Sequence, residues 1–83
     1  MKLYTKILIH LLVISLFAMG YLYIAKYVGS GKDRRNFDSF ETALYYSTIT
    51  HFTIGFGDVA PDSKEMKRLT MCQALGAFSL MAL

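Results

Sequence analysis

The sequence predicts an all-α membrane protein with two spanning helices and a short re-entrant helix between them. Hydrophobic residues make up 54% of the 83 residues, and they are concentrated in two blocks, one toward each end of the chain. Between the blocks lies a short helical segment followed by a stretch that contains glycine. Non-helical backbone is tolerated at membrane depth only where protein or water surrounds it. A re-entrant segment between two spans satisfies that condition.

Composition excludes several other classes of protein. The length allows one small domain. The net charge is +3, but the basic residues between Lys26 and Arg68 are interleaved with all six acidic residues, so no nucleic-acid-binding surface is predicted. The single cysteine, Cys72, cannot form a disulfide within the chain, and we expect it to be a buried small apolar residue. No carboxylate pair, nucleophile–base arrangement or metal cluster stands out, so the sequence does not predict an enzyme.

The first apolar block predicts a spanning helix over residues 7–27. Its first 19 residues, 7–25, contain no Asp, Glu, Lys or Arg. As a helix they measure about 28 Å, close to the ~30 Å thickness of the hydrocarbon core. Tyr21, Tyr23 and Tyr27 cluster at the far end, where an interfacial aromatic belt is expected.

Two alternatives apply to this segment. Lys2 and Lys6 ahead of an apolar run that ends in Ala-Met-Gly at 18–20 also fit a cleavable signal peptide. The continuation of the run beyond residue 20 favours a span. His10 is expected to be a neutral side chain hydrogen-bonded to a neighbouring helix; the alternative is a proton-sensitive group inside the membrane.

Residues 28–51 predict a polar linker and then a short helix. We expect residues 28–37 to be a solvated loop, because it combines glycines with a run of charged side chains. Asp38 or Ser39 can cap the next helix, which we place at residues 38–51. That helix is too short to span a bilayer.

Residues 50–58 read Thr-His-Phe-Thr-Ile-Gly-Phe-Gly-Asp, with Gly55 and Gly57 on either side of one aromatic residue. Glycine reaches positive φ at little cost, so these glycines allow alternate peptides to flip and all carbonyls to point one way. One strand supplies one oxygen per level, and a ring of oxygens needs several copies around an axis. The negative C-terminal end of the preceding helix favours a cation at the same place.

This T-x-x-T-x-G-F-G-D pattern resembles the selectivity filter of potassium channels. The order of segments over the whole chain is similar to the miniature viral potassium channels of the chlorella-virus type. The resemblance implies a homotetramer in a lipid bilayer that conducts K⁺, with residues 28–37 as the turret, 38–51 as the pore helix and 52–58 as the filter. It also implies block by Ba²⁺ or Cs⁺. The filter residues it assigns are Thr53, Ile54, Gly55, Phe56 and Gly57.

Four residues are candidates for bracing the filter: Tyr46, Ser47, His51 and Asp58. Tyr46 is expected to hydrogen-bond Asp58. This bond matters because Phe56 replaces the commoner tyrosine of the family and therefore lacks a hydroxyl. For His51 the alternative is simple packing beside the phenylalanine that follows it.

The second apolar block predicts a spanning helix over residues 66–83. Its uncharged part, 69–83, has 15 residues and measures only about 22 Å. Lys67 and Arg68 are therefore expected to extend toward the outer interface. Because the sequence ends at Leu83, we expect no cytoplasmic domain.

Five residues are candidates for the inner end of the pore. We expect the Leu83 carboxylates to form a ring at the inner mouth, partly held by Lys6. Gly76, Phe78 and Ser79 form a candidate inner gate, with Gly76 allowing close approach or bending and Ser79 bonding back to its own helix. Packing against lipid or another helix is the alternative for Phe78.

Two spans return the chain to its starting side, so we expect both termini in the cytosol. The positive-inside count disagrees, with two basic residues inside and seven outside or at the outer boundary. We give the filter resemblance more weight, and it implies a two-pass protein of a host-cell or virion membrane. The alternative function is a non-catalytic membrane hairpin that binds other membrane proteins or permeabilises without selectivity.

Overall fold

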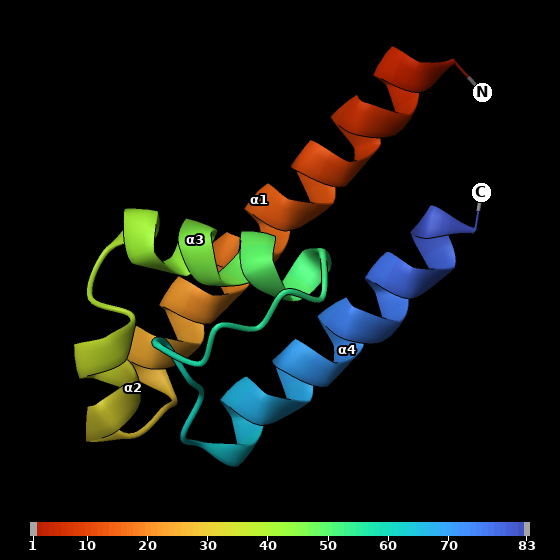
Figure 1. The fold of residues 1–83 in the computed structure, drawn as a ribbon. Helices are drawn as coiled ribbons and strands as arrows, with labels where there is room; N and C mark the ends of the chain where they lie inside the picture. Colours follow the sequence, from red (N-terminus) through yellow and green to blue (C-terminus); the bar gives the residue numbers. More distant parts are fainter. Residues whose placement is uncertain (1, 83) are drawn as a thin grey trace.

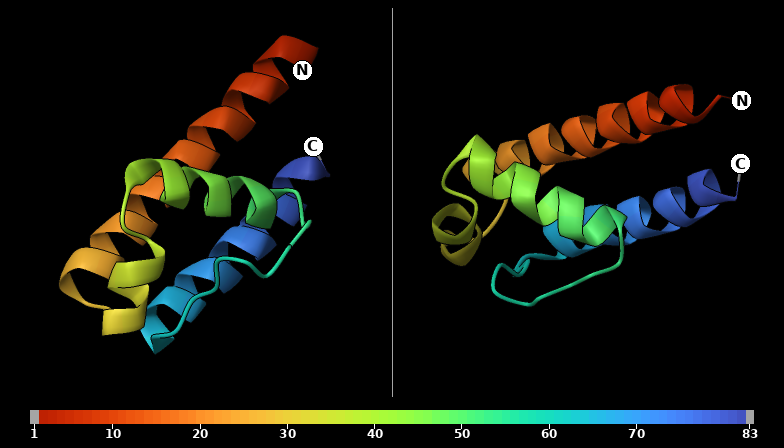
Figure 2. Two further views of the ribbon diagram at one scale, coloured as in Figure 1. Left: turned by 60° about the vertical axis from the view of Figure 1, so that its left-hand side comes forward. Right: turned by 45° about the horizontal axis from the view of Figure 1, so that its top comes forward.

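The computed structural model describes residues 2–82, and the helices of that part are α1 (Leu3–Tyr27), α2 (Gly31–Asn36), α3 (Phe40–His51) and α4 (Lys64–Met81). α1 and α4 run antiparallel, so that the start of α1 and the end of α4 lie at one end of the molecule and α2 lies at the other (Figure 1). α3 crosses α1, and its C-terminal end lies beside α4 (Figure 2). The loop after α3 runs back along α4 on the outside of the bundle, as both views of Figure 2 show.

One face of α1 forms the centre of the packing. Ile14, Ala18, Tyr21 and Ala25 are buried at spacings of four, three and four residues, which places them on a single helical face. Residues up to position 20, which a signal peptide would include, thus supply part of the core. The other side of α1 exposes a long run of leucine, isoleucine and tyrosine side chains.

Within the described residues, α1 is the helix long and apolar enough to cross a membrane. α4 has 18 residues, but four of its first five residues are charged. The expected second span therefore corresponds to a helix that length and composition alone do not identify as spanning.

Three aromatic rings hold the α2 end of the bundle together. Tyr21 of α1 stacks on Phe37 at a centroid distance of 6.0 Å, and Tyr46 of α3 packs edge-on against Tyr21 at 5.0 Å and against Phe37 at 5.1 Å. All three rings are buried. This cluster fixes where the chain enters α3.

The expectation that residues 28–37 form a solvated loop holds for the exposed basic side chains but is wrong for the backbone and for Asp33. Residues 31–36 form α2, and Asp33 within it is completely buried. The cause is a capping box: the Asp33 backbone N–H donates to the Ser30 hydroxyl, and the Ser30 backbone N–H donates to the Asp33 carboxylate. Residue 33 is thereby turned inward while its basic neighbours stay in solvent.

Serine caps begin the next two helices. Of the two expected caps of α3, Ser39 is the one used, since its hydroxyl accepts from the Thr42 backbone N–H at 3.3 Å. Ser63 caps α4 through the Met66 N–H at 3.2 Å. α4 buries Met66 and two further residues toward the bundle, but Cys72 is exposed, so the expectation of a buried cysteine is wrong.

Candidate functional site

α3 ends in a Schellman motif that starts the glycine-containing stretch, residues 52–58, which we call the glycine loop. The Thr53 N–H donates to the Thr50 carbonyl at 3.1 Å, and the Ile54 N–H donates to the Ile49 carbonyl at 2.8 Å. This pair of bonds satisfies the last carbonyls of the helix and requires the residue after the C-cap to adopt the left-handed conformation. Thr53 is that residue, with φ of 58°.

Positive φ then recurs at every second residue of the glycine loop. Gly55 has φ of 61° and Gly57 has φ of 84°, while the residues between them do not have positive φ. The expected flipping at the two glycines is thus present in the backbone. A Cβ at either glycine would meet no atom within 4 Å, so the backbone conformation and not lack of space requires glycine there.

Positive φ at Thr53 was not expected from the sequence. A β-branched residue in this region is a true outlier, and such strain amounts to about 1–3 kcal/mol. The position is the one that glycine usually occupies in a Schellman motif. A threonine is therefore kept there against local conformational preference, and its hydroxyl donates to the Phe52 carbonyl at 2.7 Å.

The side chains of the glycine loop are exposed. Ile54 is 53% exposed and Phe56 is 67% exposed, which is unusual for large apolar side chains that follow a buried helix. Behind the loop, α3 and α4 border a hollow of about 390 Å³, lined by Thr53, Gly57 and Ala74 among others. The loop is thus supported at its ends and lies free along its middle.

Asp58 at the C-terminal end of the glycine loop is held by Tyr45, not by Tyr46 as expected. The Tyr45 hydroxyl donates to Asp58 Oδ2 at 2.9 Å. Tyr46 instead points into the core, where its hydroxyl lies 3.1 Å from that of Thr70 on α4. Adjacent helical residues point about 100° apart, so only one of the two tyrosines can face the loop.

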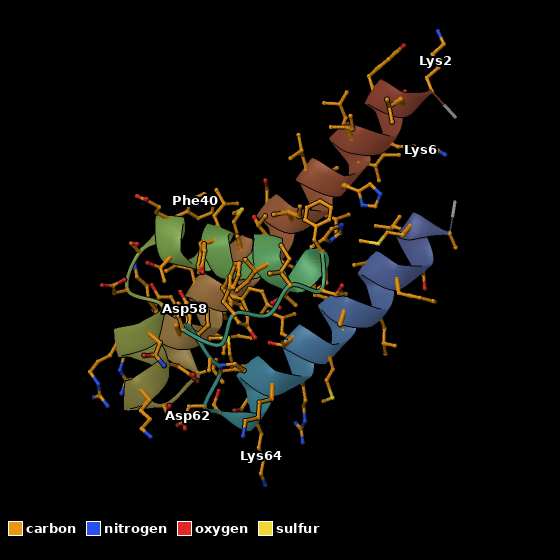
Figure 3. The ribbon with its side chains drawn as sticks, viewed as in Figure 1. Lys2, Lys6, Phe40, Asp58, Asp62 and Lys64 are labelled. Carbon is orange, nitrogen blue, oxygen red and sulfur yellow. The ribbon has the colours of Figure 1, made fainter. Side chains whose placement is uncertain are left out.

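The segment after the glycine loop is attached to α2 through Asp33. Its carboxylate accepts from the Asp62 N–H at 2.8 Å and from the Ser63 N–H at 3.2 Å, in addition to its bond from Ser30. Burial by itself raises the pKa of Asp33, but the hydrogen bonds from Ser63, Asp62 and Ser30 outweigh it and leave the pKa below its usual value. Figure 3 shows Asp62 near α2, at the same end of the molecule as Asp58.

His51 and His10 pair between α3 and α1. His10 Nδ1 and His51 Nε2 are 2.8 Å apart, with the rings edge to face at a centroid distance of 5.0 Å. The prediction that His10 hydrogen-bonds a neighbouring helix is confirmed. His51 also packs against Phe52, the alternative considered for it, and its Nδ1 is buried without a partner among the described residues.

The remaining candidate residues lie away from the glycine loop. Ser47 is buried, and its hydroxyl donates to the Ile14 carbonyl on α1 instead of to the loop. Ser79 donates to the Leu75 carbonyl at 3.0 Å, as expected, and Phe78 is 74% exposed. A Cβ at Gly76 would meet no atom within 4 Å, so no close approach within the chain requires glycine there.

Of the two residues proposed for the inner mouth, the structure describes Lys6 but not Leu83. Lys6 is half-buried on α1, and Figure 3 places it with Lys2 at the end opposite Asp58. Leu83 lies outside the described residues.

Sequence reasoning missed Tyr45, Asp33 and Gln73 of α4, which is completely buried. For Asp33 a signal was present, because Ser30-x-x-Asp33 is a capping-box pattern. For Gln73 the signal was a lone amide inside an otherwise apolar stretch. Nothing in the sequence separates Tyr45 from its neighbour.

Comparison with known proteins identifies the family. A family model described as "Ion channel" matches residues 6–83 and so includes all four helices and the glycine loop, apart from the first three residues of α1. Neither the curated proteins nor the solved structures gave a match. The chain belongs to the ion channel family.

Proposed function

We propose that this chain is the subunit of a homotetrameric potassium channel in which backbone carbonyls of residues 53–57 replace the water around a passing K⁺ ion. The observation that carries the proposal is the alternation of φ along the glycine loop, positive at Thr53, Gly55 and Gly57. An ordinary β-strand points successive carbonyls to opposite sides. Alternation in the sign of φ turns them toward one side, which produces a column of oxygens.

The number of subunits follows from the ion's need for oxygens. One strand supplies one carbonyl per level, whereas a dehydrated K⁺ ion needs a ring of them at each level. Four copies around an axis supply such rings, with Ile54 and Phe56 directed away from the axis. The Thr53 hydroxyl adds an oxygen at the inner end of each column, which gives a reason for keeping a strained threonine there.

The direction of α3 favours a cation. A helix C-terminus carries roughly half a negative charge, so four copies of α3 would place roughly two negative charges around the inner end of the filter. α3 has 12 residues and ends directly at the glycine loop. The helix ends and the carbonyl columns therefore attract the same sign of charge.

Exposed apolar surfaces support both the tetramer and the membrane. In one copy, Phe56 of the glycine loop and Leu75 and Phe78 of α4 are between 67% and 74% exposed. Apolar side chains exposed in this way mark contacts with another molecule. We place the loop and α4 against neighbouring copies and the inner cavity, and the exposed side of α1 against lipid.

The dimensions fit a two-pass subunit. The chain is 42 Å long, comparable to the ~40–45 Å of a bilayer with its headgroups. α4 measures about 27 Å in all, but its first turn is charged and its uncharged part is well short of the hydrocarbon core, so Lys67 and Arg68 extend to the outer interface. Asp58 then faces outward, and both ends of the chain face the cytosol.

At the inner end, we assign Phe78 to a dewetting constriction that narrows the cavity. The bond from Ser79 back to its own helix bends this segment of α4, and the small Gly76 makes the bend sterically easier. The resemblance to miniature viral channels favours a host-cell or virion membrane as the location.

Recording from purified protein in planar bilayers tests the proposal. We expect stepwise currents whose reversal potential follows the K⁺ gradient and not the Na⁺ gradient, with block by Ba²⁺ and Cs⁺. Currents that do not distinguish K⁺ from Na⁺ would instead indicate the permeabilising hairpin, and protein that inserts without producing any current would contradict both.

A pair of glycine variants links the current to the loop conformation. Gly55→Ala places a Cβ at φ of 61°, which is sterically unfavourable by roughly 1–2 kcal/mol per subunit, and should abolish K⁺ selectivity. Gly31→Ala is the matched control, because that glycine lies on α2, has no positive φ, and its Cβ would meet the Arg35 side chain at an ordinary contact distance of 3.6 Å. Equal selectivity in the two variants would refute the role of the alternating backbone.

A further inference from the structure

A buried amide on α4 joins the three long helices behind the glycine loop. Gln73 is completely buried, and its hydrogen bonds reach both α1 and α3. We infer that Gln73 is a positioning residue for ion selectivity, which fixes the rotation and depth of α3 and thereby the place at which the glycine loop begins. This inference rests on the proposed function.

The contacts of Gln73 use its whole amide group. Its Oε1 accepts from the Tyr21 hydroxyl on α1 at 2.7 Å. Its Nε2 donates to the Ser47 backbone carbonyl at 2.9 Å and to the Ser47 hydroxyl at 2.8 Å, both on α3. The Ser47 hydroxyl then donates to the Ile14 carbonyl of α1 at 2.7 Å. Each polar side chain in this set has a partner, and each is buried.

The bonds admit one orientation of the amide. If its oxygen and nitrogen were exchanged, the oxygen would face the Ser47 carbonyl, and two acceptors would lie against each other without a proton between them. The Ser47 hydroxyl has one proton and donates it in the hydrogen bond to the Ile14 carbonyl, so this hydroxyl can only accept from Gln73. The set is therefore directional and has no equivalent alternative.

Such a set specifies how helices align more sharply than apolar packing does. Apolar side chains can slide past one another with little change in contact, whereas a shift of α3 along α1 or α4 would leave buried donors and acceptors unpaired. A single buried polar residue is known to fix the alignment of helices in coiled coils in this way. Gln73 stands in an otherwise apolar part of α4, where solubility does not require an amide.

Alignment of α3 matters because the loop begins one turn beyond the anchor. Ser47 precedes His51, the last residue of α3, by four positions, and Thr53 follows two residues later. A rotation of α3 about its axis would move the column of carbonyls toward or away from the pore axis. That movement should therefore change the discrimination between K⁺ and Na⁺ more than it changes the stability of the folded subunit.

The test compares Gln73→Met with Cys72→Ala. Methionine has a similar length and no amide, so it keeps packing and removes all three bonds, while Cys72 is an exposed neighbour on the same helix. The K⁺/Na⁺ permeability ratio, from reversal potentials, should fall about tenfold in Gln73→Met, equivalent to about 1.4 kcal/mol, and stay unchanged in Cys72→Ala. Oligomer content and thermal stability in detergent are measured on the same samples.

Two milder variants keep the test decisive if Gln73→Met does not assemble. Ser47→Ala removes one acceptor from the amide and should lower the ratio less, whereas Tyr21→Phe leaves the bonds to α3 intact and should lower it least. A drop in stability with an unchanged ratio in Gln73→Met and Ser47→Ala would overturn the inference and leave Gln73 a packing residue. A wild-type protein that does not distinguish K⁺ from Na⁺ would overturn the proposed function itself.

Discussion

Replacing Asp33 with asparagine tests how firmly α2 holds the segment that follows the glycine loop. The Asp33 carboxylate accepts three backbone N–H groups, from Ser30 at 3.3 Å, Asp62 at 2.8 Å and Ser63 at 3.2 Å. Asparagine has one acceptor oxygen in place of two, and its NH₂ group would face a backbone donor. The variant therefore keeps either the bond to Asp62 or those to Ser30 and Ser63, but not all three.

The expected loss can be worked out from these bonds. A hydrogen bond to a charged group contributes about 1.5–3 kcal/mol, and an unpaired buried donor is unfavourable by about 1–3 kcal/mol. Water reaches Asp33 once its hydrogen bonds to Asp62 and Ser63 loosen, so the lower halves of these ranges apply. We expect Asp33→Asn to lower the free energy of unfolding by about 2–3 kcal/mol per chain. In a domain of this size that lowers Tm by roughly 10–20 °C.

Thermal unfolding in detergent, followed by circular dichroism at pH 7, measures the effect. Asp38→Asn is the matched control, because Asp38 is exposed and, within residues 2–82, accepts a single side-chain bond, from the Thr42 hydroxyl at 3.4 Å. It should change the unfolding free energy by less than about 0.5 kcal/mol. If Asp33→Asn unfolds within about 2 °C of the wild type, which is below 1 kcal/mol, the carboxylate does not hold the two segments together.

The pH dependence gives an independent check. Because the pKa of Asp33 is lowered in the folded state, its contribution is complete above the unfolded pKa of about 3.9 and is lost as pH falls through the folded value. The difference in stability between wild type and Asp33→Asn should be constant from pH 7 to about pH 5 and shrink below about pH 4. A difference that shrinks between pH 7 and pH 5 would contradict a lowered pKa.

Three further tests, which use four substitutions, concern the glycine loop and the helix that precedes it. Tyr45→Phe, which removes the bond to Asp58, should shorten channel openings, whereas Tyr46→Phe should not; single-channel recording showing equal open times would contradict the pairing. Thr53→Gly should reduce K⁺ conductance without lowering Tm, since glycine accepts the positive φ; a clear loss of Tm would refute the strain. His10→Leu should lower the unfolding free energy by about 1–3 kcal/mol by leaving its buried partner on α3 unpaired, and unchanged chemical unfolding would argue against the bond.

The sequence predicted the order of elements well because each depends on local or periodic signals. The long apolar run indicated α1, the possible caps Asp38 and Ser39 indicated the start of α3, and the two glycines indicated positive φ at residues 55 and 57. α2 was missed because a charge run usually remains solvated, and a six-residue helix has little periodicity. Its capping box was visible, but a capping box does not show that the acid at its third position is buried.

The side-chain partners were less predictable, because they depend on how helices are rotated about their axes. Tyr45 and Tyr46 differ only in which face of α3 they occupy, and that face is set by Ala43 and Ser47 packing on α1. The same rotation brings His51 to His10. Gln73 could not be placed from sequence, because its partners lie 26 and 52 residues away along the chain.

The strained and unsatisfied groups of the described residues gather at one end of α3. Thr53 has positive φ, His51 has an unpartnered Nδ1, and Phe56 of the same loop is exposed. Away from this point, buried polar residues such as Asp33 and Gln73 are well paired. Strain of this kind persists only where the surroundings hold it in place. The conformation of the glycine loop is therefore imposed by α3, by the Tyr45 bond to Asp58 and by the hydrogen bonds that tie the following segment to Asp33 of α2.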